Sequence, residues 1–371
     1  MLRKIISMAL ILLAGLFFAG APAVAAETEA SGEAESGLTI EEAVNMALEY
    51  NKDLKSQKID IEKSQEIRDL TSNAVQFIPT SPTTDAAYNA YMGLVQADIS
   101  LQMLKKSRST TEDQIAYSVL RTYLDLLGAL ENYDYQQKTM EYEQLSLNIA
   151  RVTYGVGMLS DLALEQANAK FKAAQATAAG AEVSLTGAYQ NFNKTVGLSP
   201  EARPELAERP EYSTIDVLAE NLEAEIGRVV QLNPQIWQLD QQVTLAHLNW
   251  VLYEPSSGNS SQSSYTKTLD IDKAELSADK ARISAKEALR SVYNSVRQLE
   301  ESYPAQLESI KTLESNLRLT QVRYDLGMAT KSEVKKAELD LLNQQKSLNS
   351  SIYQHELLKI TFSKPWAAGG A

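Results

Sequence analysis

Residues 151–158 read RVTYGVGM, and residues 321–328 read QVRYDLGM. In each stretch a tyrosine stands three residues before a glycine, Gly157 in the first and Gly327 in the second, and a methionine follows the glycine. Long sequences with helical apolar spacing lie on both sides of each glycine. Because glycine accepts the left-handed conformation in which many helices end, each stretch predicts a tight turn between two long helices.

The first turn joins the two longest predicted helices of the N-terminal half. Apolar residues keep a spacing of three and four from about Asp85 past Leu145. A helix that continues from there to the turn would be about 100 Å long at 1.5 Å per residue. After the turn, Ser160 can cap an alanine-rich helix over about 161–195. The two helices together predict an antiparallel, coiled-coil-like hairpin.

A shorter helix precedes this hairpin. Thr39 and Glu42 match the Thr-x-x-Glu pattern of a capping box, which opens a helix. An apolar stripe continues from there to about Phe77, and the segment Ile78-Pro79-Thr80-Ser81-Pro82 ends it. A polar segment with three prolines follows the alanine-rich helix and predicts a linker over 198–213.

The C-terminal half repeats this order of elements. We expect a helix from Thr214, a polar loop over 254–264, a helix of about 90 Å over about 266–325, and a last helix over about 331–362. Three landmarks recur in the same order in both halves. They are Asn51 and Asn233 after an apolar pair, the tyrosine–glycine–methionine pattern, and Ala167 and Ala337 ten residues beyond each glycine. Chance recurrence in helical sequence is the alternative, but the shared order favours a duplication.

The first residues have the features of a secretory signal peptide. Arg3 and Lys4 precede an apolar run over 5–18, and small residues over 21–26 offer A-x-A cleavage sites. A single membrane anchor is the alternative, but 14 apolar residues fall short of the ~20 that a spanning helix needs. We therefore expect an exported protein. The predicted divisions are 1–26 signal peptide, 27–37 flexible acidic lead-in, 38–197 first repeat, 198–213 linker, 214–362 second repeat and 363–371 loose tail.

The composition and the missing motifs exclude several classes of catalytic and metal-binding site. The chain has no cysteine, which excludes disulfides, thiol nucleophiles and cysteine-ligated metals. Its two histidines, His247 and His355, are far apart and too few for a multi-histidine metal site, and each is expected to be packed or solvated. A net charge of −13 argues against nucleic acid as a partner. No phosphate-binding, dinucleotide-binding or hydrolase motif is present. We therefore predict no catalytic residue, no metal and no cofactor, and a protein that is not an enzyme.

Helices of this length impose a packing requirement. A helix of sixty residues with a narrow apolar stripe cannot enclose a globular core, so other helices must bury the stripe along its length. Two hairpins in one chain can bury part of each other's stripes. The sequence therefore predicts an all-α protein built from long antiparallel hairpins, with a closed monomeric bundle as the alternative.

The ordered landmarks resemble a known family. They are the secretory signal, Leu38-x4-Ala43-x3-Ala47-Leu48-x2-Asn51-x2-Leu54, Tyr123-Leu-Asp-Leu-Leu127, Tyr154-x-x-Gly157, and Arg323-Tyr-Asp-Leu-Gly-Met328. Over about 38–362 this pattern resembles the TolC-like outer-membrane efflux family. The resemblance implies a homotrimer in which twelve helices form a tunnel, together with a periplasmic adaptor protein and an inner-membrane pump. It also implies that Tyr154, Gly157, Tyr324 and Gly327 lie at the hairpin tips, where the adaptor and the gate meet.

In that family each repeat inserts a β-hairpin between its first two long helices, and these hairpins form a barrel in the outer membrane. The corresponding segments here, 78–85 and 254–264, are too short for two strands of ~9–11 residues each. We therefore expect a TolC-like tunnel protomer whose β-hairpin insertions are reduced to short loops. The location implied by the resemblance is the outer membrane, and the location implied by the signal peptide is the cell envelope.

Two functions are compatible with these expectations. The first is an export duct that solutes cross passively, beside a pump and an adaptor. The second is a barrel-less coiled-coil scaffold or adaptor-binding protein of the cell envelope. A duct requires a ring of protomers around a wet axis, whereas a scaffold can act as a monomer or a dimer.

Overall fold

The computed structural model describes residues 37–79, 85–217, 219–252 and 263–369. The expected signal peptide and nearly all of the acidic lead-in lie outside these residues. So does most of each segment in which we expect a reduced insertion, at 80–84 and 253–262.

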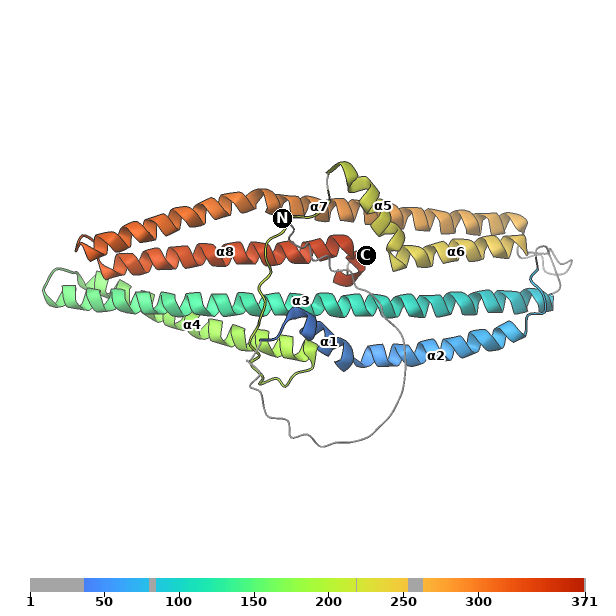
Figure 1. Cartoon of the computed structure of the whole chain (residues 1–371), viewed down its shortest axis with the longest axis horizontal. Helices are drawn as coiled ribbons and strands as arrows, with labels where there is room; N and C mark the ends of the chain where they lie inside the picture. The colour runs from blue at the N-terminus through green and yellow to red at the C-terminus, as the bar shows by residue number, and fades with distance from the viewer. Residues whose placement is uncertain (1–36, 80–84, 218, 253–262, 370–371) are drawn as a thin grey trace, which may run out of the picture. The chain divides into compact units, whose positions relative to one another are not determined.

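The described residues are almost entirely helical, which confirms the predicted fold class (Figure 1). The first half contains α1 (Ile40–Tyr50), α2 (Lys52–Asn73), α3 (Asp85–Gly155) and α4 (Asp161–Val196). The second half contains α5 (Leu222–Leu232), α6 (Pro234–Val251), α7 (Ser264–Asp325) and α8 (Lys331–Ser363). Two short 3₁₀ helices are η1 (Ala219–Asn221) and η2 (Pro365–Ala368). Within this part of the chain β pairing is limited to an isolated parallel bridge between Leu38 and Leu206.

The two halves pack in the same way. In the first half α1, α2 and α4 all lie against α3, and in the second half α5, α6 and α8 all lie against α7. The halves join where α3 packs along α8. The four long helices therefore follow the order α4, α3, α8, α7, with α3 and α8 in the middle.

An aromatic pair at equivalent positions marks the core of each repeat. Tyr123 and Tyr293 each lie 34 residues before the turn glycine, and Phe192 and Phe362 each lie 35 residues after it. The ring centroids are 5.9 Å apart in both pairs, and all four side chains are buried. Helix α1 packs on the first pair through two buried alanines, and α5 packs on the second through three buried aliphatic side chains. This shared core supports the prediction of two repeats.

The first helix is broken where we expected it to continue to Phe77. Asn51 has φ −64° and ψ 122°, which ends α1, and its side-chain oxygen accepts the backbone N–H of Leu54 to begin α2. Asn233 has φ −65° and ψ 120° and joins α5 to α6 in the same way. The paired asparagines are thus helix caps, which the apolar stripe concealed because it continues across the break.

The start of the second repeat also differs from the prediction. We expected a helix from Thr214, but helical structure begins only at η1 and α5. The backbone N–H of Ile215 instead donates a hydrogen bond of 2.6 Å to the Glu300 carboxylate of α7. A contact with a distant residue therefore satisfies the backbone that local sequence would have placed in a helix.

The linker and the tail are both held against α3. The Tyr123 hydroxyl accepts the N–H of Glu208 at 3.0 Å, in the middle of the linker. The C-terminal segment differs from the loose tail that the sequence predicted. Trp366 donates its indole N–H to Asp113 at 2.7 Å, Lys364 pairs with the same carboxylate at 2.6 Å, and Ala367 is buried. Across residues 37–79, 85–217, 219–252 and 263–369, every helix is too short or too polar to meet the requirements of a membrane span.

Candidate functional site

The predicted tip of the first hairpin is a tight turn between α3 and α4. Gly157 has φ +76°, the left-handed conformation that glycine adopts without strain. Its N–H donates to the carbonyl of Tyr154 at 2.8 Å, and the N–H of Met158 donates to the carbonyl of Thr153 at 3.0 Å. This pair of bonds is a Schellman motif, which satisfies the last carbonyls of a helix. Ser160 then caps α4 by accepting the N–H of Ala163.

The second tip has the same construction. Gly327 has φ +73°, its N–H donates to Tyr324 at 2.9 Å, and the N–H of Met328 donates to Arg323 at 2.7 Å. Thr330 caps α8 and forms a full capping box with Glu333. The structure therefore places each predicted tip residue in one of two equivalent helix-ending turns. Sequence reasoning identified both turns because the backbone conformation at each depends on a local glycine.

Both tips expose apolar side chains. Met158 and Met328 are 79% and 71% exposed. Further exposed apolar side chains on the two tips are Val152, Val156, Leu162, Val322 and Leu326. Large apolar side chains gathered at a helix turn are a common mark of a contact surface for another protein.

The two tips lie at the same end of the helix pairs. Asn132 of α3 contacts Lys346 of α8, and Asp113 of α3 contacts Lys364, the residue directly after α8, so the two helices are antiparallel. The end of α3 and the start of α8 therefore point the same way, and each adjoins a tip.

The tips differ in charge. Asp161 follows the cap of the first tip, and its carboxylate raises the pKa of the neighbouring Tyr154 hydroxyl. Lys331 occupies the same place in the second tip. Two similar turns thus present an acidic and a basic residue at the equivalent position, which would let a partner distinguish them.

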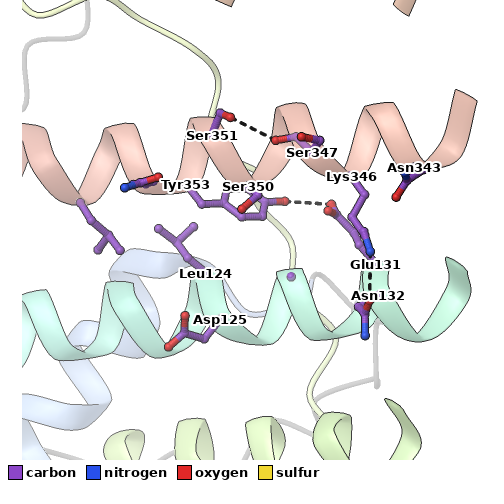
Figure 2. A pocket seen from close by; sticks show the side chains of 13 residues that line it. Leu124, Asp125, Glu131, Asn132, Asn343, Lys346, Ser347, Ser350, Ser351 and Tyr353 are labelled. Atoms are coloured by element: carbon purple, nitrogen blue, oxygen red, sulfur yellow. Dashed lines mark hydrogen bonds between the residues drawn. The ribbon is translucent and has the colours of Figure 1, made fainter. Parts of the chain in front are cut away.

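A polar cavity of about 690 Å³ lies between α3 and α8 (Figure 2). At its centre Glu131 accepts hydrogen bonds from Tyr353 at 2.9 Å, Asn349 at 2.8 Å and Arg209 of the linker at 3.0 Å. All three donors use one carboxylate oxygen, and the other oxygen is buried with no hydrogen-bond partner. Burial, with Glu131 adding to it, raises the pKa of the Tyr353 hydroxyl.

The remaining lining of this cavity is also polar. Lys346 donates to Asn132 at 3.0 Å and lies 4.5 Å from the ring of Tyr135, and burial lowers its pKa. Hydroxyl and amide side chains complete the walls, among them Ser347, Ser350, Ser351, Asn343 and Gln354. Such walls suit water or a polar solute. The sequence did not reveal this cavity because it depends on the register between two helices about 200 residues apart.

The two histidines have different surroundings. His247 is half exposed, and its Nε2 lies 3.3 Å from Oε1 of Glu275. His355 is buried, and its Nε2 lies 3.2 Å from Oε1 of Glu300. In the described part of the chain no group of three histidine, aspartate or glutamate side chains is arranged to hold a metal ion.

No protein-family model matches the chain, and no curated protein matches it. Solved structures do. The Campylobacter jejuni outer-membrane channel CmeC aligns over 89% of this chain and 86% of its own, with a TM-score of 0.60 at 13% identity. The chain has a TolC-like fold. CusC, described in connection with transmembrane channel formation, aligns over 93% of this chain and 95% of its own, with a TM-score of 0.61 at 13% identity. The Vibrio cholerae outer-membrane protein VceC aligns over 90% and 96%, with a TM-score of 0.57 at 15% identity.

The TolC-like fold accounts for the arrangement of the helices. Two helical repeats and two long hairpins are what the sequence resemblance implied, and the fold confirms that expectation. At 13–15% identity the likeness concerns the fold, so the function of this chain needs its own argument from the residues.

Proposed function

We propose that this TolC-like chain is a protomer of a passive export duct in the cell envelope. Three copies form a ring whose axis solutes cross, and an adaptor protein and an inner-membrane pump supply the direction of transport. The channel descriptions of CmeC and of CusC support this proposal by analogy of fold.

The observation that carries the proposal is that the two outer helices, α4 and α7, each have a face that no other long helix among the described residues covers. In the order α4, α3, α8, α7, the inner helices pack on both sides, whereas α4 packs chiefly on α3 and α1, and α7 on α8, α6 and α5. Both flanks retain exposed apolar side chains, namely Val183 on α4 and Leu269, Leu276, Ile283 and Leu319 on α7. Pairing α4 of one copy with α7 of the next is a head-to-tail contact, and such contacts form a ring when the rotation from copy to copy closes.

The tips provide the contact surface for an adaptor. Tyr154, Gly157, Tyr324 and Gly327 shape two turns that present methionine and aliphatic side chains to solvent. Methionine is flexible and adapts to a partner's surface, so it suits docking between coiled coils. We propose that these turns meet the adaptor.

The test is the absolute mass of the mature protein, residues 27–371, measured by light scattering after size exclusion without detergent. We expect three times the protomer mass. A stable monomer would contradict the ring and favour the coiled-coil scaffold instead. Binding of a candidate adaptor to the monomer, lost when Met158 and Met328 are both changed to Asp, would then identify the tips as the scaffold's contact surface.

A further inference from the structure

A buried acid–histidine pair lies where the linker meets the second repeat. Glu300 of α7 and His355 of α8 have side chains only 3% and 1% exposed, and His355 Nε2 lies 3.2 Å from Glu300 Oε1. Glu300 also accepts the N–H of Ile215 at 2.6 Å and pairs with Arg297 at 2.6 Å. One carboxylate thus joins α7, α8 and the linker.

Two further contacts fix the linker at this point. The ring of Tyr212 stacks on Tyr303 of α7, with centroids 3.6 Å apart and an interplanar angle of 8°. Lys359 of α8 donates to the Ser213 hydroxyl at 2.7 Å. The tilted ring of Tyr212 also lies 5.4 Å from His355. Residues 212–215, at the end of the linker and the start of the second repeat, therefore lie directly on the acid–histidine pair.

The internal repeat provides a reference for this pair. Positions equivalent in the two repeats are 170 residues apart, as Gly157 and Gly327 are. By that relation Leu130 corresponds to Glu300 and Leu185 corresponds to His355, and both leucines pack against the first core. The same fold thus accepts an apolar pair here. A buried ionic pair is often no more stable than an apolar one, so packing alone does not account for Glu300 and His355.

The hydrogen bonds of His355 leave room for one more proton. A carboxylate only accepts, so Nε2 carries the hydrogen that faces Glu300. In the neutral ring Nδ1 is then a bare acceptor, and it is buried with no hydrogen-bond partner. The nearest acid is Glu356, whose Oε1 lies 3.8 Å away. A proton on Nδ1 would place the imidazolium between two carboxylates.

Charged and titratable groups of α7, α8 and the linker surround this pair. From α7 the neighbours are Arg297, Glu301 and Tyr303, and from α8 they are Glu356 and Lys359. From the linker, Glu208, Arg209 and Glu211 share a cavity with Glu356, to which α3 contributes Leu120. Arg209 already pairs with Glu131 of α3. Around the pair itself Glu300, Glu301 and Glu356 face two cations, so a charged His355 would balance them.

We propose that Glu300 and His355 form a proton-controlled lock, which holds residues 212–215 more tightly on α7 and α8 when His355 is protonated. Histidine is the side chain whose charge can change near neutral pH, so the lock is tested between a mildly acidic and a mildly basic solution. Burial raises the pKa of Glu300, but the donors Ile215 N–H, His355 and Arg297 outweigh it and hold the pKa below its ordinary value. Glu300 therefore stays ionised in both solutions. The lock does not depend on the proposed duct.

The test is amide hydrogen exchange of the full-length mature protein at pH 5.5 and pH 7.5, corrected for the pH dependence of chemical exchange. We expect the peptide that covers 207–217 to open several-fold less often at pH 5.5 than at pH 7.5, because protonation of His355 would add a contact that holds this segment. The segment 37–40 is an internal reference. It packs on the first repeat, where leucines replace the pair, and its protection should not change with pH.

Two variants separate the lock from simple packing. His355→Gln keeps an N–H donor for Glu300 but gains no proton, so the pH difference should disappear while protection remains. Glu300→Leu combined with His355→Leu copies the first repeat and should fold, with the same protection at both pH values. Equal protection in the wild type at both pH values would overturn the proposal, and so would a pH difference that persists in His355→Gln.

Discussion

At the scale of single residues, the two turn glycines decide where each hairpin folds back. Gly157 and Gly327 both have positive φ, and an added Cβ would meet no atom within 4 Å at either position. The need for glycine is therefore conformational and not steric. A left-handed backbone costs an ordinary residue ~1–2 kcal/mol, and a β-branched side chain is the least tolerant of it.

Gly327→Val should accordingly lower the free energy of unfolding by about 2 kcal/mol, measured by urea denaturation. The matched control is Gly180→Ala. Gly180 lies inside α4, and an added Cβ also meets nothing within 4 Å there, but its backbone is helical. Alanine should stabilise that position by about 0.5–1 kcal/mol. If both variants lose stability equally, the turn conformation is not what requires Gly327.

Single residues also show which features of the structure could not be predicted from the sequence. The tip residues were predictable because a turn is a local property of the backbone. Glu131 and Glu300 were not, because each gains its role from partners on the linker and on a distant helix. Nothing in the neighbourhood of Glu300 in the sequence distinguishes it from Glu301, which is exposed. Only the register of α7 on α8 separates a buried acid from a solvated one.

At the scale of helices, the apolar period predicted the long elements well. The four helices of the two hairpins begin and end within about three residues of their expected limits, because a long amphipathic stripe allows few alternatives. The short elements were less predictable. Asn51 interrupts a stripe that continues in sequence, and Ile215 gives its N–H to another helix instead of to its own.

The second helices of the two hairpins, α4 and α8, begin with different caps. This difference predicts that the first turns of the two helices respond differently to acidic pH. Thr330 and Glu333 bond reciprocally at the start of α8, and the backbone N–H of Thr330 lowers the pKa of Glu333. A lowered folded-state pKa means that the ionised carboxylate stabilises the cap above about pH 4.5. That contribution is lost as the pH falls through the lower folded value.

We therefore expect the first-turn amides of α8 to lose exchange protection below about pH 4.5. Glu333→Gln retains a capping oxygen without a titrating group and should flatten this response. The first turn of α4 is the internal control. Ser160 caps it, and Ala163 stands where α8 has Glu333, so Asp161 is the acid of this turn and no capping-box carboxylate is present. Its protection should therefore fall less than that of α8 in this range. Equal acid sensitivity in α4 and α8 would contradict the role of Glu333.

At the scale of the whole molecule, the two outer helices, α4 and α7, determine which assemblies the protein can form. A closed bundle would bring α4 and α7 of the same chain together, but the contacts place α3 and α8 between them. The exposed apolar side chains on α4 and α7 therefore face outward from the chain. In a head-to-tail assembly a neighbouring copy can cover one flank, and two neighbouring copies cover both.

The chain has no cysteine, so introduced cysteines can test this contact directly. Val183 lies 26 residues after Gly157 on α4, and α7 approaches its own turn from the opposite direction. Residues at a similar distance before Gly327, such as Gln298 and Ala305, should therefore lie at the same height in a neighbouring copy. Oxidation of Val183→Cys combined with Gln298→Cys or Ala305→Cys, in intact cells, should produce linked species that end at three protomers.

Val183→Cys combined with Asp272→Cys is the matched control, because Asp272 lies on α7 about 40–50 Å further from the tip than those positions at 1.5 Å per residue. It should give only background linkage. Linked species that end at two protomers would mean that α4 and α7 pair in a dimer, and the proposed trimeric tunnel would then be wrong. A series that ends at three requires that each copy offers α4 to one neighbour and α7 to the other, which is the condition for a closed ring with a continuous axis.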